Sequence, residues 1–267
     1  MNLRFLNSRK IINIIEIASQ LILQIYHRDS FNVEIKQDNS PLTEADKKAN
    51  EYICNELMSI YPDIPIISEE NKNADYNIRS KYKYAWLIDP LDGTKEFINK
   101  NGEFTVNIGL IHLGVPVAGF VNIPCSGITY WSIKDCGAWK KNYDEDDSVM
   151  IEPHDSHIKK RKTIVLASRS HMNEETVQYI SKLGEVELKN VGSSIKLMWI
   201  AENKADVYPR IAPTMEWDTC ASDAILRELG GGCMIYGKER ERENEYLVYN
   251  KESLLNPSFI ARLNSNS

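Results

Sequence analysis

Apolar residues recur at helical spacing near the start of the chain. The positions that share this spacing are Ile11, Ile14, Ile15, Ala18, Ile22 and Ile25. Because residues three and four apart lie on one face of a helix, the pattern predicts an amphipathic helix that starts near Ser8. Polar residues interrupt the run, which is too short for a transmembrane span and lacks the features of a signal peptide. We expect its apolar face to pack on the body of the protein, with attachment to a membrane surface as the alternative.

A second helix is predicted from Thr43, where Thr43 as N-cap and Asp46 three residues later have the spacing of a capping box. An apolar strand follows at residues 84–88 and ends at Asp89. Runs with strand-like spacing then predict consecutive antiparallel strands at residues 104–111, 117–123, 127–132 and 137–141.

The remaining chain alternates between strand and helix patterns, which predicts a layered α/β half. The predicted strands are residues 163–167, 205–208, 233–236 and 246–249, and the predicted helices are residues 173–183, 193–202 and 217–229. We place a domain boundary near residue 160, so that residues 1–160 form an N-terminal α+β domain with most metal ligands and residues 161–267 a C-terminal α/β domain.

Composition narrows the class of protein. The chain has 267 residues, is 42% hydrophobic and carries a formal net charge of −6, so it can bury a large core but lacks the basic surface that nucleic-acid binding needs. The five cysteines are scattered and odd in number, which predicts reduced thiols in a cytosol rather than disulfides or a zinc site. Two charge-rich runs, residues 144–147 and 239–243, are interpreted as solvated loops.

Residues 89–94, which read Asp-Pro-Leu-Asp-Gly-Thr, contain the first candidate chemistry. The proline turns the chain after the strand, and Gly93 permits tight backbone geometry, so Asp89 and Asp92 can converge. Two close carboxylates repel each other, and a hard divalent cation with oxygen ligands, the Leu91 carbonyl among them, relieves that repulsion. An ordinary turn is the alternative interpretation of this run.

Two more acids stand at the ends of predicted elements. Glu69 follows an apolar run, and Asp218 lies where a helix begins, although a helix-capping role would also explain an aspartate there. The sequence has no phosphate-binding P-loop, no dinucleotide fingerprint, no nucleophile elbow and no paired histidine metal motif. Ligation by oxygen alone favours Mg²⁺ over zinc.

These motifs resemble the inositol monophosphatase-like superfamily, and in particular its bacterial 3′(2′),5′-bisphosphate nucleotidases. The central motif is residues 89–94, with Trp217-Asp218 and Glu69 as its companions. Lys95-Glu96-Phe97 favours the nucleotidase branch over the inositol phosphatases. Further runs that share the resemblance are residues 40–46, 168–171, 192–196, 208–210 and 249–257.

The resemblance implies a layered αβαβα sandwich and a set of metal ligands. Glu69, Asp89 and the Leu91 carbonyl would hold one Mg²⁺, and Asp89, Asp92 and Asp218 a second, with a third ion left open. Asp46 would orient Thr94, whose hydroxyl activates the attacking water near Glu69. The implied catalytic residues are therefore Asp46, Glu69 and Thr94.

The implied substrate contacts extend beyond the metal ligands. They comprise Glu69, Leu91, Asp92, Gly93, Thr94, His171, Gly192, Lys196 and Asp218, with Arg169 and Arg210 as further candidates for a second phosphate. One departure from the family pattern is Cys220-Ala221-Ser222, where Ala-Ala-Gly is common after Trp-Asp-Thr. It leaves metal binding intact but puts nucleobase or ribose selectivity in doubt.

The sequence therefore predicts a Mg²⁺-dependent hydrolase that converts adenosine 3′,5′-bisphosphate to AMP and phosphate. A sugar- or inositol-phosphate phosphatase and a non-catalytic nucleotide or metal sensor are the alternatives. We expect a small-molecule nucleotide bisphosphate as partner, no nucleic acid and no stable protein partner, and a monomer with a dimer left open. The expected location is the cytoplasm, with the cytoplasmic face of the inner membrane as the alternative.

Overall fold

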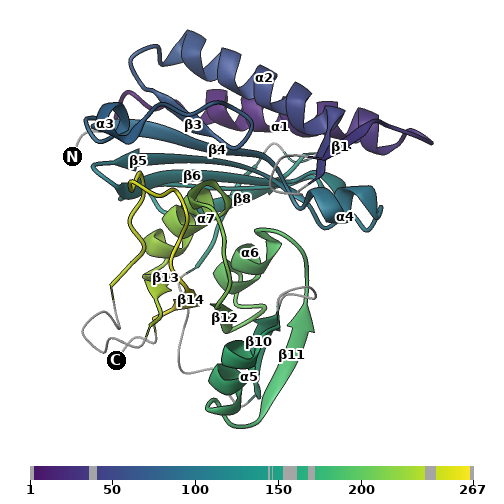
Figure 1. The fold of residues 1–267 in the computed structure, drawn as a ribbon, viewed down its shortest axis with the longest axis vertical. Coiled ribbons are helices and arrows are strands. Elements are labelled where there is room, and N and C mark those ends of the chain that lie inside the picture. The colour runs from purple at the N-terminus through teal and green to yellow at the C-terminus, as the bar shows by residue number, and fades with distance from the viewer. Residues whose placement is uncertain are drawn as a thin grey trace.

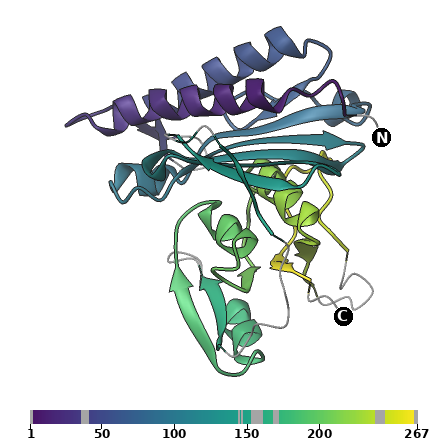
Figure 2. The same cartoon turned by 180° about the vertical axis from the view of Figure 1, so that it is seen from behind.

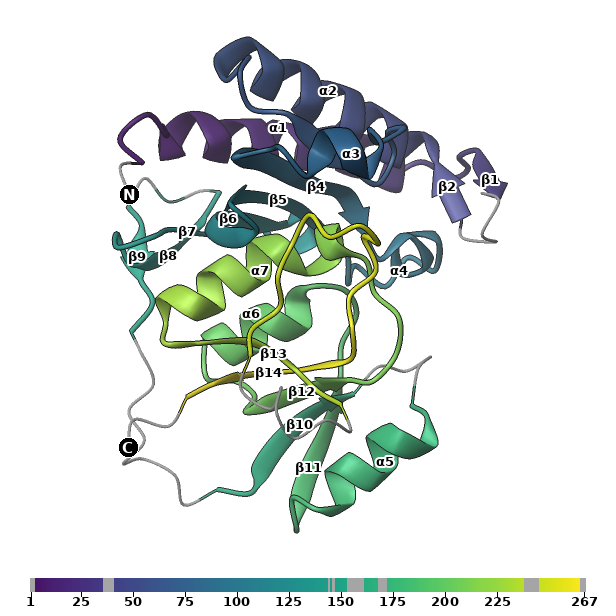
Figure 3. The same ribbon diagram turned by 60° about the vertical axis from the view of Figure 1, so that its left-hand side comes forward.

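The computed structural model describes residues 3–35, 41–143, 145, 147–152, 161–167, 172–237 and 245–264. Its helices and strands stack in five layers, which Figures 1 and 3 show from two sides. Two long helices cover a seven-stranded sheet, two more helices separate this sheet from a five-stranded sheet, and a short helix lies on the far face. The layered αβαβα sandwich that the resemblance implied is confirmed.

The outer helical layer consists of α1 (Ser8–Tyr26) and α2 (Glu44–Ile60), and α1 lies along the sheet in Figure 2. Helix α1 begins where the apolar spacing predicted, and its apolar face is buried against the body of the protein. Thr43 and Asp46 form the predicted capping box at the start of α2. Among the described residues, no helix combines the length and apolar character needed to cross a bilayer.

The seven-stranded sheet has the order β3-β4-β5-β6-β7-β8-β9, parallel between β3 and β4 and antiparallel elsewhere. Its strands are β3 (Ile66–Ser68), β4 (Tyr84–Asp92), β5 (Thr105–His112), β6 (Val115–Ile123), β7 (Ile128–Ile133), β8 (Ala138–Asn142) and β9 (Val149–Met150). Smaller elements are β1 (Val33–Ile35), β2 (Pro41–Thr43), α3 (Tyr76–Arg79), α4 (Thr94–Ile98) and a 3₁₀ turn, η1 (Pro124–Ser126). The four predicted antiparallel strands are confirmed, whereas the short β9 was not predicted.

Strand β4 does not end at Asp89, as the sequence predicted, but continues to Asp92 through a bulge. Asp89 pairs with Asn107 and Asp92 with Thr105, so β4 carries one residue more than β5 over this stretch. Residues three apart on a regular strand face opposite sides of the sheet, and one extra residue restores the same side. Leu91 accordingly joins the core beneath α1 and α2. The bulge therefore turns Asp89 and Asp92 towards the second half of the chain.

The five-stranded sheet has the order β11-β10-β12-β14-β13. Its strands are β10 (Thr163–Ala167), β11 (Val186–Asn190), β12 (Val207–Arg210), β13 (Gly231–Ile235) and β14 (Phe259–Leu263), and the helices beside it are α5 (Glu174–Ser181), α6 (Ile195–Ala201) and α7 (Glu216–Glu228). Helices α6 and α7 lie between the two sheets, and their apolar side chains share one core with both.

One strand prediction in this half was wrong, and two strands were not predicted. Residues 246–249 form no strand: β14 pairs with one edge of β13, and along its other edge this segment makes only an isolated bridge, between Tyr246 and Met234. The segment sends its N–H groups to different partners instead: Leu247 donates to Cys233 and Tyr249 to Gly114. Strands β11 and β14 were not predicted; β11 is a half-exposed edge strand without an apolar run.

The domain boundary near residue 160 stays a prediction, since residues 153–160 lie outside the described part of the chain. Of the two charge-rich runs, the described residues Glu145 and Asp147 are exposed, and residues 238–244 lie outside the description. All five cysteines are free thiols, as predicted.

Helix α7 approaches the large sheet at two glycines that pair across β5 and β6. Gly109 faces Gly119 in the strand register, and a Cβ atom added at Gly119 would lie 1.9 Å from the Ala221 carbonyl oxygen. A Cβ atom at Gly109 would lie 2.6 Å from the Cys220 sulfur. Backbone therefore packs on backbone here, which brings the first turn of α7 close to the strand that carries Asp89.

This packing predicts that Gly119→Ala is strongly destabilising. The added methyl group must displace helix backbone, which cannot yield as a flexible side chain can, so we expect a loss of about 3 kcal/mol or more in the free energy of unfolding. Gly237→Ala is the matched control, because nothing lies within 4 Å of its added Cβ atom. Urea unfolding of both variants tests this; equal midpoints for Gly119→Ala and wild type would contradict it.

Candidate metal centre and phosphate pocket

Three carboxylates from three elements converge between the large sheet and α7. Glu69 directly follows β3, Asp89 lies in β4 and Asp218 lies in the first turn of α7. One oxygen of each lies within 4.8 Å of the others. Glu69 reaches this place because β3 runs parallel to β4, and its N–H donates to the Ile88 carbonyl at 3.1 Å. This arrangement has the geometry of a metal site.

The electrostatics of the cluster favour a cation. Burial raises the pKa of Asp89 well above its usual range, and the charges of Glu69, Asp92 and Asp218 raise it further. Burial, then Asp92 and Glu69, raise the pKa of Asp218 in the same way. Buried like charges are costly unless an opposite charge compensates them. An all-carboxylate donor set is what a hard divalent cation binds, so these residues fit the metal that the family pattern implies.

Asp92 lies beside this group but is engaged by a different partner. Its Oδ2 accepts hydrogen bonds from the backbone N–H and the hydroxyl of Ser194, both at 2.6 Å, and from Thr105 at 3.4 Å. The Ser194 hydroxyl also lies 3.1 Å from the Asp218 carbonyl oxygen. Ser194 was not predicted as a site residue, although the motif at residues 192–196 contains it. The assignment of Asp92 to a second ion stays a prediction.

The structure brings Asp46 and Thr94 together, as expected for the water-activating pair. Asp46 is 1% exposed, and its Oδ2 accepts the N–H and hydroxyl of Thr43 in the capping box. Its other oxygen, Oδ1, accepts the Thr94 hydroxyl at 3.2 Å. One carboxylate thus caps α2 and also holds the Thr94 side chain.

The turn after Asp92 provides backbone groups at the same place. Gly93 has φ of +96°, a left-handed conformation that favours glycine, and it starts the short helix α4. The Leu91 carbonyl oxygen lies 3.4 Å from the Thr94 hydroxyl. The turn thus brings the Leu91 carbonyl and the Thr94 hydroxyl together beside Asp46, while the roles of Leu91, Gly93 and Thr94 stay predictions.

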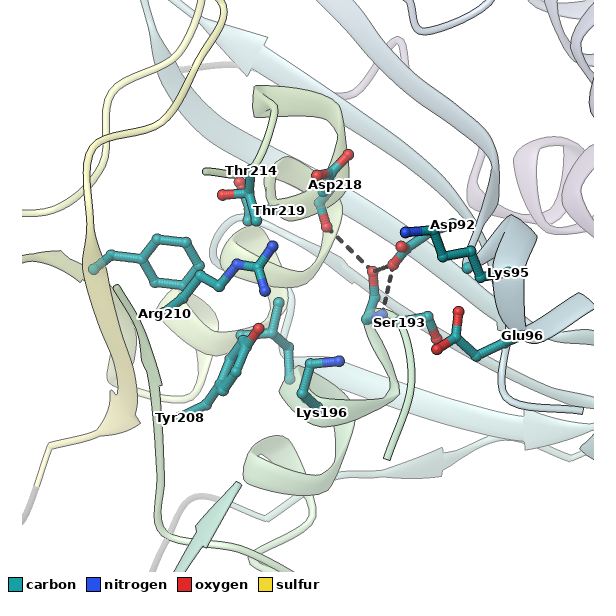
Figure 4. A pocket seen from close by; sticks show the side chains of 14 residues that line it. Asp92, Lys95, Glu96, Ser193, Lys196, Tyr208, Arg210, Thr214, Asp218 and Thr219 are labelled. Carbon is teal, nitrogen blue, oxygen red and sulfur yellow. Dashed lines mark hydrogen bonds between the residues drawn. The ribbon is translucent and has the colours of Figure 1, made fainter. Parts of the chain in front are cut away.

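A pocket opens from the acids towards a basic wall made by α6 and β12. Lys196, Tyr208 and Arg210 form this wall opposite Asp92, Lys95 and Glu96 in Figure 4. Burial lowers the pKa of Lys196 to about 8, against the pull of Asp92, and its Nζ lies over the Tyr208 ring. Tyr208, Lys95 and Glu96 were not predicted as site residues, although two of the quoted motifs contain them.

Two polar atoms of this wall are buried without a hydrogen-bond partner among the described residues: Arg210 Nε and Thr214 Oγ1. One N–H group of the Arg210 guanidinium donates a hydrogen bond to the Pro213 carbonyl at 2.7 Å. Both residues line the pocket. The remaining donor capacity at this wall suits an anionic ligand.

Three other predicted substrate contacts, Gly192, Arg169 and His171, are not seen to line the pocket in the described part of the chain. The Gly192 N–H donates to Glu103 at 2.8 Å, and a Cβ atom there would lie 2.6 Å from the Glu103 carbonyl oxygen, so this glycine allows a close approach of two loops. Its substrate contact stays a prediction. Arg169 and His171 lie outside the described residues.

The departure at Cys220-Ala221-Ser222 faces the sheet. Cys220 and Ala221 pack on Gly109 and Gly119, and Ser222 is fully buried with a hydroxyl that has no partner among the described residues. On α7 the pocket is lined by Asp218 and Thr219 instead. The departure thus changes helix packing and does not touch the pocket.

Comparison with known proteins identifies the family to which this chain belongs. The model of the inositol monophosphatase family matches residues 9–266, and the chain belongs to this family. The chain is 38% identical over 244 residues to the 3′(2′),5′-bisphosphate nucleotidase CysQ of Escherichia coli K12, with 91% of this chain and 94% of the relative covered. The corresponding CysQ of Salmonella typhimurium has the same identity and coverage.

Solved structures agree with the sequence relatives. CysQ from Bacteroides thetaiotaomicron, described as a bacterial member of the inositol monophosphatase family, superimposes with a TM-score of 0.81 at 43% identity and covers 96% of this chain and 97% of its own. The suhB protein of Bartonella henselae shares the fold with a TM-score of 0.74 at 21% identity, over 96% of this chain and 93% of its own. The resemblance to the nucleotidase branch is confirmed.

The raised pKa of Asp89 predicts how the metal-free protein responds to pH. Since the folded state holds this proton more tightly than the unfolded chain, stability falls as pH rises from the usual aspartate range, about 4, through the raised pKa. We expect Asp89→Asn to raise the unfolding temperature in EDTA at pH 7, and this gain to shrink as pH approaches about 4.

Differential scanning fluorimetry with EDTA and with Mg²⁺ measures this difference. Mg²⁺ should raise the unfolding temperature of the wild type more than that of Asp89→Asn. The exposed Asp147 provides the control, because Asp147→Asn should change neither value. If Asp89→Asn were less stable than wild type in EDTA at pH 7, burial and the neighbouring carboxylates would not destabilise the ionised form of Asp89 as predicted.

Proposed function

We propose that this chain is a Mg²⁺-dependent 3′(2′),5′-bisphosphate nucleotidase that hydrolyses adenosine 3′,5′-bisphosphate to AMP and phosphate. The observation that carries the proposal is the convergence of Glu69, Asp89 and Asp218 within 4.8 Å, beside a pocket that Asp218 lines together with the basic residues Lys196 and Arg210. The names of the similar CysQ proteins support the same substrate class.

The metal ligands are assigned to two Mg²⁺ ions. Glu69, Asp89 and the Leu91 carbonyl would hold one ion, and Asp89, Asp92 and Asp218 would hold the other. Bound there, Mg²⁺ neutralises charge on the phosphoryl oxygens and the leaving group and makes the attacking water more acidic.

The chain's own groups aim the water and move its proton. Thr94 Oγ1 accepts from the water and donates its own proton to Asp46 Oδ1, to which it is already hydrogen-bonded at 3.2 Å. Glu69 holds the water from the other side. Backbone N–H groups at Gly93 and Thr94 bind the phosphoryl oxygens at the start of α4.

The basic wall binds the phosphate that is not cleaved. Lys196 and Arg210 carry positive charge on the side of the pocket opposite the acids, and Thr214 adds a hydroxyl. A substrate with two phosphates can place one at the acids and the other at this wall. That division favours a bisphosphate over inositol monophosphate, which has one phosphate only.

The proposal includes a monomeric enzyme in the cytoplasm with no nucleic-acid or stable protein partner. The formal net charge of −6 supports a small-molecule substrate over a nucleic acid.

A phosphate-release screen tests the substrate class. With Mg²⁺ present, kcat/KM should be highest for adenosine 3′,5′-bisphosphate, lower for 3′-AMP, which lacks the second phosphate, and lowest for inositol monophosphate. Fructose 1,6-bisphosphate also has two phosphates, so it tests whether two phosphates alone are sufficient. The ratio of kcat/KM for adenosine 3′,5′-bisphosphate to that for 3′-AMP measures the contribution of the basic wall. One hydrogen bond to a charged group contributes about 1.5–3 kcal/mol, which corresponds to a ratio of roughly 10- to 100-fold.

Asp92→Asn is the control for this screen. Asparagine keeps an oxygen that can accept from Ser194, so the fold should survive while nearly all turnover is lost. Near wild-type activity in this variant would contradict the metal assignment. A wide preference for inositol monophosphate would sink the nucleotidase proposal, and no turnover of any substrate with intact Mg²⁺ binding would favour the sensor.

Lys196 predicts an alkaline limit on the reaction. Its pKa of about 8 means that Lys196 loses its charge as pH rises through that value, and its attraction for the second phosphate is lost with the proton. Because kcat/KM reports the groups of the free enzyme, we expect it to fall above pH 8.

Lys196→Arg provides the matched variant, since a guanidinium stays protonated throughout this range. The ratio of the kcat/KM of Lys196→Arg to that of wild type should rise between pH 7 and pH 9.5, about 1 unit below and 1.5 above the lysine pKa. A constant ratio would show that another group sets the alkaline limb.

A further inference from the structure

The two metal ligands Glu69 and Asp218 belong to elements that are far apart in the sequence, and a buried arginine joins the segments that carry them. Arg79 ends the short helix α3, which follows the loop after Glu69. Its side chain reaches the C-terminal segment, residues 249–256, in the other half of the chain. Figure 3 shows this segment, in yellow, running along α7 towards the large sheet.

Arg79 is 5% exposed, and its guanidinium spans both sides of the junction. On its own side, Nε donates to the Ala74 carbonyl at 2.8 Å. Across the junction, NH1 donates to the Asn250 side chain at 2.8 Å and to the Lys251 carbonyl at 3.1 Å, and NH2 donates to the Glu252 carbonyl at 3.1 Å. The Asn250 amide returns a bond to the Arg79 carbonyl at 2.7 Å.

No acidic side chain is ion-paired with Arg79 among the described residues. A buried charge is costly unless its hydrogen bonds are satisfied, and here neutral oxygens satisfy it. A planar fork of donors can hold several acceptors at once, which a lysine ammonium cannot do in the same geometry. These contacts are what a clamp between two backbone segments requires.

The C-terminal segment in turn holds the first turn of α7. The backbone N–H groups of Asn250 and Lys251 and the Lys251 ammonium all donate to the carboxylate of Glu216, which is fully buried. The Glu216 N–H donates to the Leu254 carbonyl at 2.9 Å, and Asn256 donates to the Met215 carbonyl at 2.9 Å. Asp218 is two residues further along, and it accepts the Met215 N–H at 2.9 Å.

The loop that contains Glu69, residues 68–73, is also held by several hydrogen bonds. The Asn73 side chain binds both the N–H and the carbonyl of Ser68, at 3.1 and 3.0 Å. The Ser68 hydroxyl donates to Asn50 at 2.6 Å, and Asn50 donates to Asn71 at 2.8 Å. A displacement of Arg79 is therefore transmitted to Glu69 through a loop with little freedom of its own.

We propose that Arg79 is a positioning residue for the metal centre, which holds the Glu69 loop and the start of α7 at the separation that lets one cation bind Glu69 and Asp218 together. This inference rests on the proposed function, in that the three acids must be a metal site. Arg79 touches neither metal nor substrate; it acts through the backbone segments it joins.

The test is Mn²⁺ binding to full-length Arg79→Met and Arg79→Lys, measured by titration calorimetry and electron paramagnetic resonance at a temperature where both are folded. Loss of a residue that orients metal ligands weakens affinity by about 10- to 100-fold, and we expect this for both variants. At saturating metal, KM for the nucleotide should stay near wild type. A merely structural role would lower the unfolding temperature and leave the Mn²⁺ affinity unchanged.

Arg161→Met is the control for loss of an arginine away from the site. Arg161 also binds several acceptors, both Asp206 oxygens and the Asn203 carbonyl, but it lies outside the acid cluster and the pocket lining. Its loss should not change the Mn²⁺ affinity. An equal weakening in Arg161→Met would trace the effect to general loosening of the fold and overturn the proposal.

Asn250→Gly keeps the proposal testable if Arg79→Met does not fold. It removes both side-chain bonds to Arg79, and glycine accepts the φ of +60° found at this position. It should weaken Mn²⁺ binding, and in the double variant the affinity should match that of Arg79→Met alone. The inference would be overturned if the losses of Mn²⁺ affinity in the two single variants multiplied in the double variant, or if the single variants bound Mn²⁺ as tightly as wild type. If the wild type itself did not bind Mn²⁺, the proposed function would be wrong instead.

Discussion

The backbone contact between α7 and the paired glycines of β5 and β6 is the constraint on which the site depends. Asp218 comes from the second half of the chain and meets Glu69 and Asp89 only if α7 lies directly on the sheet. Gly109 and Gly119 leave no side chain in the way, so the carbonyl of Ala221 can occupy the space of a Cβ atom. Every later step, from metal ligation to placement of the pocket, assumes this depth of packing.

Two of the site's carboxylates also serve the helices that carry them. Asp46 caps α2 through one oxygen and holds Thr94 through the other. Asp218 accepts an N–H at the start of α7 and still lies within 4.8 Å of Glu69 and Asp89. A helix N-terminus stabilises negative charge, which lowers the cost of burying these acids. The capping interpretation of these residues is confirmed, and it is compatible with their functional roles, which stay predictions.

The sequence predicted most of what depends on local patterns. The capping box at Thr43, the antiparallel strands and the run at residues 89–94 all leave local signals. The bulge in β4 does not, because an extra residue is defined only relative to the partner strand. The extent of strand β14 and of the pairing at residues 246–249 also depends on tertiary contacts, since β14 pairs along one edge of β13 while Tyr246 meets the other edge only as an isolated bridge. Ser194 and Arg79 act over long sequence distances, and their residue types alone give no sign of it.

The acids also explain why the two halves need more than apolar packing to stay in register. Burial and mutual repulsion raise the pKa of Asp89 and Asp218, so their ionised forms, when no cation is bound, favour separation of the start of α7 from β4. Three contacts oppose that push: the glycine packing of α7, the bonds from Ser194 to Asp92, and the Arg79 junction with residues 250–252. A scaffold that holds the carboxylates close together before a cation binds lowers the free energy needed to assemble the site. The cation therefore binds with higher affinity. If the acids bind a cation as proposed, its affinity depends on residues well outside the ligand set.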